Sequence, residues 1–395
     1  DGDARTITAD PRALLSQGER YDLILAALPE PSSLRNNRTY TREFFAACAG
    51  ALEPGGILAF RLPGAENLWS EPVAWRAASI RRSAAEALPH VLILPGAVNV
   101  VLCSREPLTR DPAVLSARFR ERGLQGRLVD PAYLEYLLTN DRLAASESRL
   151  AEIDAPPNTD DRPVCFRYTS ALWLSRFYPA LGYVTGDPLA ASFPAVAALV
   201  VAFLLLATLV ARRRTRRRTL MLAGAAGWLG MAWETVLIVH YQAGGSSLYR
   251  DLGLLLTLFM GGMALGASIH ARPAAGAGRR ALILPATLAV FAAGLALSLG
   301  RGRPGGLAGT AVWLVAGGAL AAALFVRASS GSALAGRASV AAIYGVDLLG
   351  GCLGALLVGL YLAPLAGLTG TAAATVLVAA AAVALVGSDE HGVGL

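Results

Sequence analysis

Long apolar runs fill the chain from about residue 190 onward. The first, 193–211, contains no charged residue and is followed directly by RRRTRRR. Its length is close to the roughly 20 residues that cross a bilayer. The same length rule predicts about seven membrane-spanning helices, near 193–211, 219–241, 251–270, 281–299, 307–327, 338–362 and 368–387. The second half of the chain is therefore expected to be a polytopic helical bundle in contact with a lipid bilayer.

The first half has a different pattern, in which short apolar runs alternate with helical stretches. The predicted elements are a run at 22–28, a helix over 41–52, a run at 56–62, a helix over 71–87, and two runs at 91–96 and 99–105 that predict a hairpin. Strands and helices in this order are typical of a doubly wound α/β sheet. The predicted fold class is therefore α/β followed by an all-α membrane domain.

These patterns divide the chain into four parts. The parts are an α/β domain over 1–180, a linker over 181–192, a transmembrane helical domain over 193–387 and a tail over 388–395. The chain starts at DGDARTIT, with neither a methionine nor a signal segment before it. We therefore expect a fragment of a longer protein, whose missing part holds the first strand and its glycine-rich nucleotide-binding turn.

Composition fits a hybrid of a soluble and a membrane domain. Hydrophobic residues make up 54% of the chain, charged residues 16%, and the mean hydropathy is +0.49. The net charge is +7, but the basic run abuts a span and has no interleaved aromatics, so no nucleic-acid partner is expected. The four cysteines show no CxxC or histidine-paired spacing, and neither a metal site nor a disulfide framework is predicted.

Several motifs resemble a known family. YDLILAALPEP at 21–31, NNRTYTREFF at 36–45 and LEPGGILAF at 52–60 are similar to the second half of spermidine synthase, an aminopropyltransferase on a methyltransferase-type Rossmann fold. A further set resembles bacterial membrane proteins in which such a domain is fused to transmembrane segments: NTDDRP at 158–163, WETVLIVHYQ at 233–242, LFMGGMALGA at 258–267 and YGVDLLGGCLGALL at 344–357. The resemblance implies the C-terminal half of a methyltransferase-type domain in a bacterial inner membrane protein.

The resemblance also implies ligands. The family donor is decarboxylated S-adenosylmethionine, and Asp3 corresponds to the acidic strand end that faces its adenine. The acceptor would be a polyamine or another small amine. Active members carry two acidic residues in the segment that matches 21–31, and these fall on Ala27 and Glu30. An alanine cannot accept the proton that an amine nucleophile must lose, so the domain is expected to be catalytically degenerate.

Two residues remain candidates for a catalytic role, namely Glu30 and Tyr40. The alternative for Tyr40 is packing at a helix start. In NTDDRP, Asn158, Asp160 and Asp161 are candidates to bind a cation or amine, and the alternative is a turn, since Asn, Asp and Pro favour turns.

Within the spans, Glu234 and Asp347 stand out as intramembrane carboxylates. An acidic side chain at the centre of a span costs of order 3 kcal/mol, so such groups face a bundle interior, a partner or a water cavity. They are functional candidates, and the alternative is neutral, hydrogen-bonded packing. Two function classes follow: a degenerate membrane-tethered transferase, or a membrane transporter or sensor for polyamines or similar cations.

The distribution of arginines among the loops predicts which side of the membrane each loop faces. Most basic residues outside the first domain fall in the loops after the first, third and fifth spans, which predicts that these loops are cytoplasmic. The α/β domain would then lie on the extracytoplasmic side, away from the cytoplasmic S-adenosyl donors. Three interpretations stay open: the first span does not cross, the domain has lost catalysis, or it binds an extracytoplasmic ligand. Homo-oligomerisation also stays open.

Overall fold

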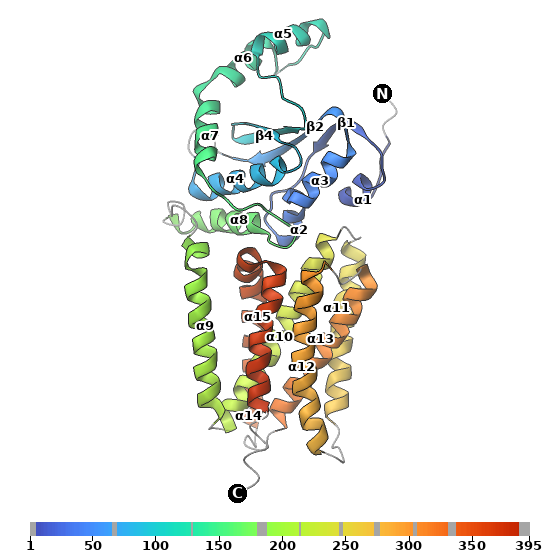
Figure 1. Cartoon of the computed structure of the whole chain (residues 1–395), viewed down its shortest axis with the longest axis vertical. Coiled ribbons are helices and arrows are strands. Elements are labelled where there is room, and N and C mark those ends of the chain that lie inside the picture. The colour runs from blue at the N-terminus through green and yellow to red at the C-terminus, as the bar shows by residue number, and fades with distance from the viewer. Residues whose placement is uncertain are drawn as a thin grey trace. The chain divides into compact units, whose positions relative to one another are not determined.

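The computed structural model describes residues 5–64, 69–127, 129–179, 188–212, 215–244, 248–271, 277–302, 306–330 and 337–386. The chain divides into two compact units, Asp1–Asp187 and Pro188–Leu395, which we call unit 1 and unit 2. Strands occur in unit 1, and the described part of unit 2 is helical (Figure 1). The predicted coarse layout, an α/β domain followed by a helical membrane domain, is confirmed.

A mixed four-stranded sheet forms the centre of unit 1. Its strands are β1 (Tyr21–Ala26), β2 (Leu52–Pro63), β3 (His90–Leu94) and β4 (Val98–Ser104). They lie in the order β1-β2-β4-β3, with β1 parallel to β2 and β4 antiparallel to both of its neighbours. The apolar runs therefore form strands as predicted, and the last two form the predicted hairpin.

The other described elements of unit 1 are helices. They are α1 (Pro11–Leu15), α2 (Leu34–Asn37), the short 3₁₀ helix η1 (Arg38–Tyr40), α3 (Arg42–Ala51), α4 (Glu71–Ala85), α5 (Pro112–Glu121), α6 (Pro131–Thr139), α7 (Asp141–Glu152) and α8 (Val164–Ser175). The core of unit 1 lies between one face of the sheet and α3 and α4, where Phe45, Leu58 and Ile80 are fully buried. On β1, Leu23 and Leu25 of the opposite face are exposed.

Unit 2 consists of long apolar helices. They are α9 (Pro188–Arg212), α10 (Thr215–Ala243), α11 (Leu248–His270), α12 (Ala277–Gly300), α13 (Gly306–Ser329), α14 (Arg337–Leu357), the π-helix η3 (Val358–Leu362) and α15 (Ala363–Val386). Six stretches among the described residues are long and apolar enough to cross a bilayer. The chain is therefore an integral membrane protein.

The last of the six stretches differs from the prediction of two separate spans. It runs for 47 residues from Val340 to Val386 and includes α14, η3 and α15. A straight helix of this length would extend about 70 Å, more than twice the apolar thickness of a bilayer. Gly367 interrupts it with a φ of 79° and a ψ of 169°, outside the helical region. The break accounts for two predicted spans within one continuous apolar stretch.

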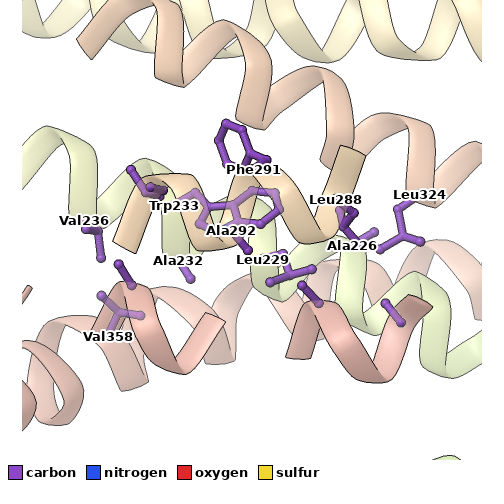
Figure 2. Close-up of a cluster of buried hydrophobic side chains, with 14 of the residues drawn as sticks. Ala226, Leu229, Ala232, Trp233, Val236, Leu288, Phe291, Ala292, Leu324 and Val358 are labelled. Atoms are coloured by element: carbon purple, nitrogen blue, oxygen red, sulfur yellow. The ribbon is translucent and has the colours of Figure 1, made fainter. Parts of the chain in front are cut away.

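Small residues bring the helices of unit 2 close together. A Cβ atom on Gly227 of α10 would collide with the main-chain oxygen of Asp347 on α14, and one on Gly262 of α11 with that of Val315 on α13. Glycines at these positions therefore allow the helix backbones to approach each other closely. Larger side chains fill the interior elsewhere: the ring centroids of Trp233 and Phe291 are 4.7 Å apart (Figure 2).

Candidate functional site

The first candidate site lies at the carboxyl ends of the parallel strands β1 and β2. This edge is where open α/β sheets bind ligands. Ala27 follows β1 directly, and Glu30 lies three residues further along the chain. The segment after β1 therefore holds one carboxylate where the resemblance implies two.

Arg76 of α4 binds this carboxylate. Its Nη1 atom is 3.0 Å from Oε1 of Glu30, and the Arg76 side chain is 1% exposed while that of Glu30 is 35% exposed. The same guanidinium donates to the carbonyl oxygen of Pro63 at the end of β2, at 2.6 Å, and to Oγ1 of Thr169 on α8, at 3.4 Å. One buried cation thus connects the ends of both parallel strands to α8.

Tyr40 lies in the interior. Its side chain is fully buried, its hydroxyl donates to the carbonyl oxygen of Leu28 at 3.4 Å, and its ring meets Phe60 edge-on at 6.0 Å. Burial raises the pKa of the hydroxyl well above its ordinary value of 10. Such a group stays protonated at neutral pH. The geometry agrees with the packing alternative for Tyr40, and its catalytic role stays a prediction.

The NTDDRP segment is held by other parts of unit 1. Asp160 accepts from both terminal nitrogens of Arg12, at 2.6 and 2.7 Å, and from the hydroxyl of Thr41 at 2.7 Å. Asn158 is fully buried and donates to the carbonyl oxygen of Tyr40 at 2.9 Å. Because both side chains are occupied, these contacts favour the turn over a cation site.

The remaining residues of unit 1 considered for a chemical role are Asp3 and the cysteines. Asp3, the residue implied to face adenine, lies outside the described residues. Burial raises the pKa of the Cys48, Cys103 and Cys165 thiols to about 12, so they are inert at neutral pH. Within the described ranges, no three His, Cys, Asp or Glu side chains gather closely enough to hold a metal ion.

The second candidate site is Glu234, in the middle of α10. Its side chain is buried, with 8% of its surface exposed. Among the residues that the structure describes, none forms a hydrogen bond or ion pair with its carboxyl group. Its neighbour Trp233 is engaged, because the indole nitrogen donates to Oγ1 of Thr375 at 3.0 Å. Glu234 is therefore a buried acid without a partner among the described residues.

The structure does not place Asp347 beside Glu234. The main chain of Asp347 meets α10 at Gly227, two helical turns from Glu234, which is about 10 Å along the axis. Asp347 is half-buried on the α14 face that packs against α10. The two intramembrane carboxylates thus lie at different depths along one helix interface.

A further buried acid lies near the end of α10. Asp251, at the start of α11, is 5% exposed and accepts a hydrogen bond from the hydroxyl of Tyr241 at 2.7 Å. Sequence reasoning treated Asp251 only as the first residue of a span. The signal for its role is an aspartate placed directly before an uninterrupted apolar run, ten residues after a tyrosine that ends the preceding one.

Comparison with protein-family models finds no family that matches the chain, and comparison with curated proteins finds no similar protein. The functional conclusion therefore depends on the geometry of the two sites and on the motifs that led to them.

Proposed function

We propose that the protein is an integral membrane protein whose unit 1 is a spermidine synthase-like domain that no longer transfers aminopropyl groups. The ion pair between Glu30 and buried Arg76 carries this proposal. Transfer requires a group that accepts the amine proton. Ala27 cannot accept it, the carboxylate of Glu30 is bound to Arg76, and Tyr40 is buried and protonated.

The fold assigned to unit 1 in this proposal is the C-terminal half of a methyltransferase-type Rossmann domain. Two features support it. The parallel strands β1 and β2 are joined through α3, as in a βαβ unit, and the sheet is completed by a hairpin whose last strand is antiparallel. The ligands remain those of the family: decarboxylated S-adenosylmethionine, and a polyamine or other small amine.

A transfer assay tests the loss of catalysis. The protein in lipid nanodiscs is incubated with decarboxylated S-adenosylmethionine and putrescine, and release of methylthioadenosine is measured. We expect no release above the protein-free rate, and turnover would overturn the proposal. Ala27→Asp should raise release, whereas the matched variant Ala27→Asn should not, because an amide is not a base. Donor binding without any rescue would show that more than this position is lost.

A second function, cation translocation through unit 2, is favoured by Glu234. A buried carboxyl group without a protein partner is stable in an apolar interior only when it is protonated or binds a cation. Polyamine and proton flux are measured in proteoliposomes. Glu234→Gln should abolish flux, Glu234→Asp should retain part of it, and Cys352→Ser on α14 is the matched control. Normal flux in Glu234→Gln would exclude this function.

The membrane in this proposal is the bacterial inner membrane, with the arginine-rich loops in the cytoplasm and unit 1 outside. This orientation is supported by the arginine distribution and would separate unit 1 from cytoplasmic S-adenosyl donors. It is tested with Arg120→Cys, at an exposed position of α5, in a Cys352→Ser background. An impermeant maleimide should label intact cells. Labelling only after permeabilisation would reverse the orientation and make transferase chemistry accessible again.

A further inference from the structure

The first half of helix α8 is buried in unit 1, whereas its last turn is exposed. Its first half belongs to the core of unit 1, where Val164 and Cys165 are fully buried and Tyr168 is 5% exposed. Side chains from two other segments fix its first turn, because Asn158 accepts from the Cys165 amide at 3.2 Å and Asn37 from the Phe166 amide at 3.1 Å. The start of α8 is thus rigidly attached to unit 1.

The other end of α8 and the turn after it present large apolar side chains to the surroundings. The exposed fractions are 57% for Trp173, 40% for Leu174, 64% for Phe177 and 64% for Tyr178. The ring centroids of Trp173 and Phe177 are 5.0 Å apart, as residues four apart on one side of a helix are expected to be. Four such side chains in one place form a contiguous patch rather than scattered surface residues.

The patch lies shortly before the first candidate span in the chain, and this position indicates that lipid covers it. The first candidate span begins at Phe193, within a helix that starts at Pro188. The chain between Tyr178 and Pro188 can extend to about 35 Å at most, so the patch remains tethered close to the bilayer. Tryptophan and tyrosine favour the membrane–water interface, where the ring is apolar and its polar edge is hydrated. Arg176, exposed among them, suits lipid phosphates.

We propose that this patch of Trp173, Leu174, Phe177 and Tyr178 inserts into the headgroup region of the bilayer and docks unit 1 on the membrane surface. The docking is a second membrane attachment, separate from the spans of unit 2. It also positions the first candidate site. Thr169, which contacts Arg76, is one helical turn before Trp173 on the same helix, about 6 Å along its axis. The Glu30–Arg76 pair is therefore held close to the lipid surface, whatever ligand it binds.

Spin-label accessibility tests the docking on the whole protein. The label is attached to Phe177→Cys in a Cys352→Ser background, in nanodiscs of phosphatidylcholine and phosphatidylglycerol at about 3:1. The three native thiols of unit 1 are buried and, with pKa values raised to about 12, do not compete. Arg120→Cys on α5 is the matched exposed control in the same unit.

The docked patch predicts that collisions with oxygen, which concentrates in lipid, exceed those with a water-soluble nickel chelate several-fold at position 177. At position 120, collisions with the nickel chelate should exceed those with oxygen. Higher nickel than oxygen accessibility at 177 would show that the patch is in water. Low accessibility to both reagents would show that protein covers it. Either of these results overturns the proposal, and neither depends on whether unit 1 is catalytic.

A second measurement does not require a label. Brominated lipids quench tryptophan fluorescence over short distances, so Trp173→Phe should remove part of the quenching seen with the unchanged protein. Because Trp173 is 57% exposed and makes its ring contact with Phe177, the variant is expected to fold. Equal quenching in the two proteins would contradict the insertion of this side chain.

Discussion

Unit 1 pairs Arg12, Arg38 and Arg76 with carboxylates, whereas in unit 2 the buried carboxyl group of Glu234 pairs with none of the described residues. In unit 1, Arg12 binds Asp160 at 2.6 Å and Arg38 binds Asp10 at 2.6 Å, each through a mostly buried side chain. In the described part of unit 2, Glu234 has no such cation. The charged pairs of unit 1 connect segments far apart in its sequence, whereas Glu234 is the group on which the proposed cation translocation depends.

The strongest test of this contrast is Asp160→Ala in unit 1. The substitution removes the Asp160 carboxylate from the mostly buried Arg12 guanidinium, and removal of one partner of a buried ion pair costs about 3–5 kcal/mol. Hydrogen exchange of the amides of β2 should accelerate accordingly, and unit 2 should be unaffected. Asp154→Ala is the matched control, because its side chain is 92% exposed although it also pairs with an arginine, Arg82. Equal effects of the two variants would contradict a structural role for the buried pair.

Gly227→Ala tests the packing of unit 2. The added Cβ would collide with the main chain of Asp347, so α10 and α14 must move apart, at a cost of roughly 2–3 kcal/mol. Gly261→Ala is the control, because a Cβ there meets no atom within 4 Å. Thermal unfolding in detergent should show a lower midpoint for Gly227→Ala alone. A similar midpoint for both variants would mean that the two helices are not held together at this contact.

Alkaline pH should weaken unit 1. Burial raises the pKa of Cys48, Cys103 and Cys165 from 9.0 to about 12, so the unfolded chain releases these protons first. Their contribution is fully present below pH 9 and is lost between pH 9 and 12, at roughly 1 kcal/mol per pH unit for each thiol. The chain contains no lysine, so no lysine titrates in this range. Cys103→Ala should reduce the slope of unit 1 stability against pH. An unchanged slope would contradict the attribution of this pH dependence to the buried thiols.

The smallest expected effect concerns a neutral hydrogen bond of unit 2. Thr375→Val removes the acceptor of the Trp233 indole and leaves a buried donor unpaired, at about 1–2 kcal/mol. Thr375→Ser restores the hydroxyl and should recover most of the loss. The midpoint of thermal unfolding measures both. If Thr375→Val unfolds at the same midpoint as the unchanged protein, the Trp233–Thr375 hydrogen bond does not contribute to the stability of unit 2.

Local patterns in the sequence predicted the elements well. The strands of the sheet follow from short apolar runs between turn residues, and the helices of unit 2 follow from run length alone. The sheet order was not predictable, because the pairing of β4 between β2 and β3 depends on contacts far apart in sequence. Helices α5, α6 and α7 had no prediction, and few of their apolar residues are buried.

The contacts between side chains of the candidate site were likewise not predictable from the sequence. Ala27 and Glu30 could be identified from a motif, but the partner of Glu30 is Arg76, 46 residues away. The role of Asp160 likewise depends on Arg12, 148 residues earlier in the chain. Side chains brought together by the tertiary fold leave no periodic signal in one sequence. For Glu234 the opposite holds, since an isolated acid in an apolar run is visible without any partner.

The break at Gly367 has a consequence for how the protein is made. A ribosome delivers the 47 apolar residues from Val340 to Val386 to the insertion machinery with Asp347 as their only charged residue. No charged loop separates their two halves, so the stretch is expected to enter the bilayer as one hairpin rather than as two successive insertions. Both ends of a hairpin stay on the side where it started. A reporter fused after Val386 would therefore report the side of Arg337, which makes it a convenient marker of orientation during biosynthesis.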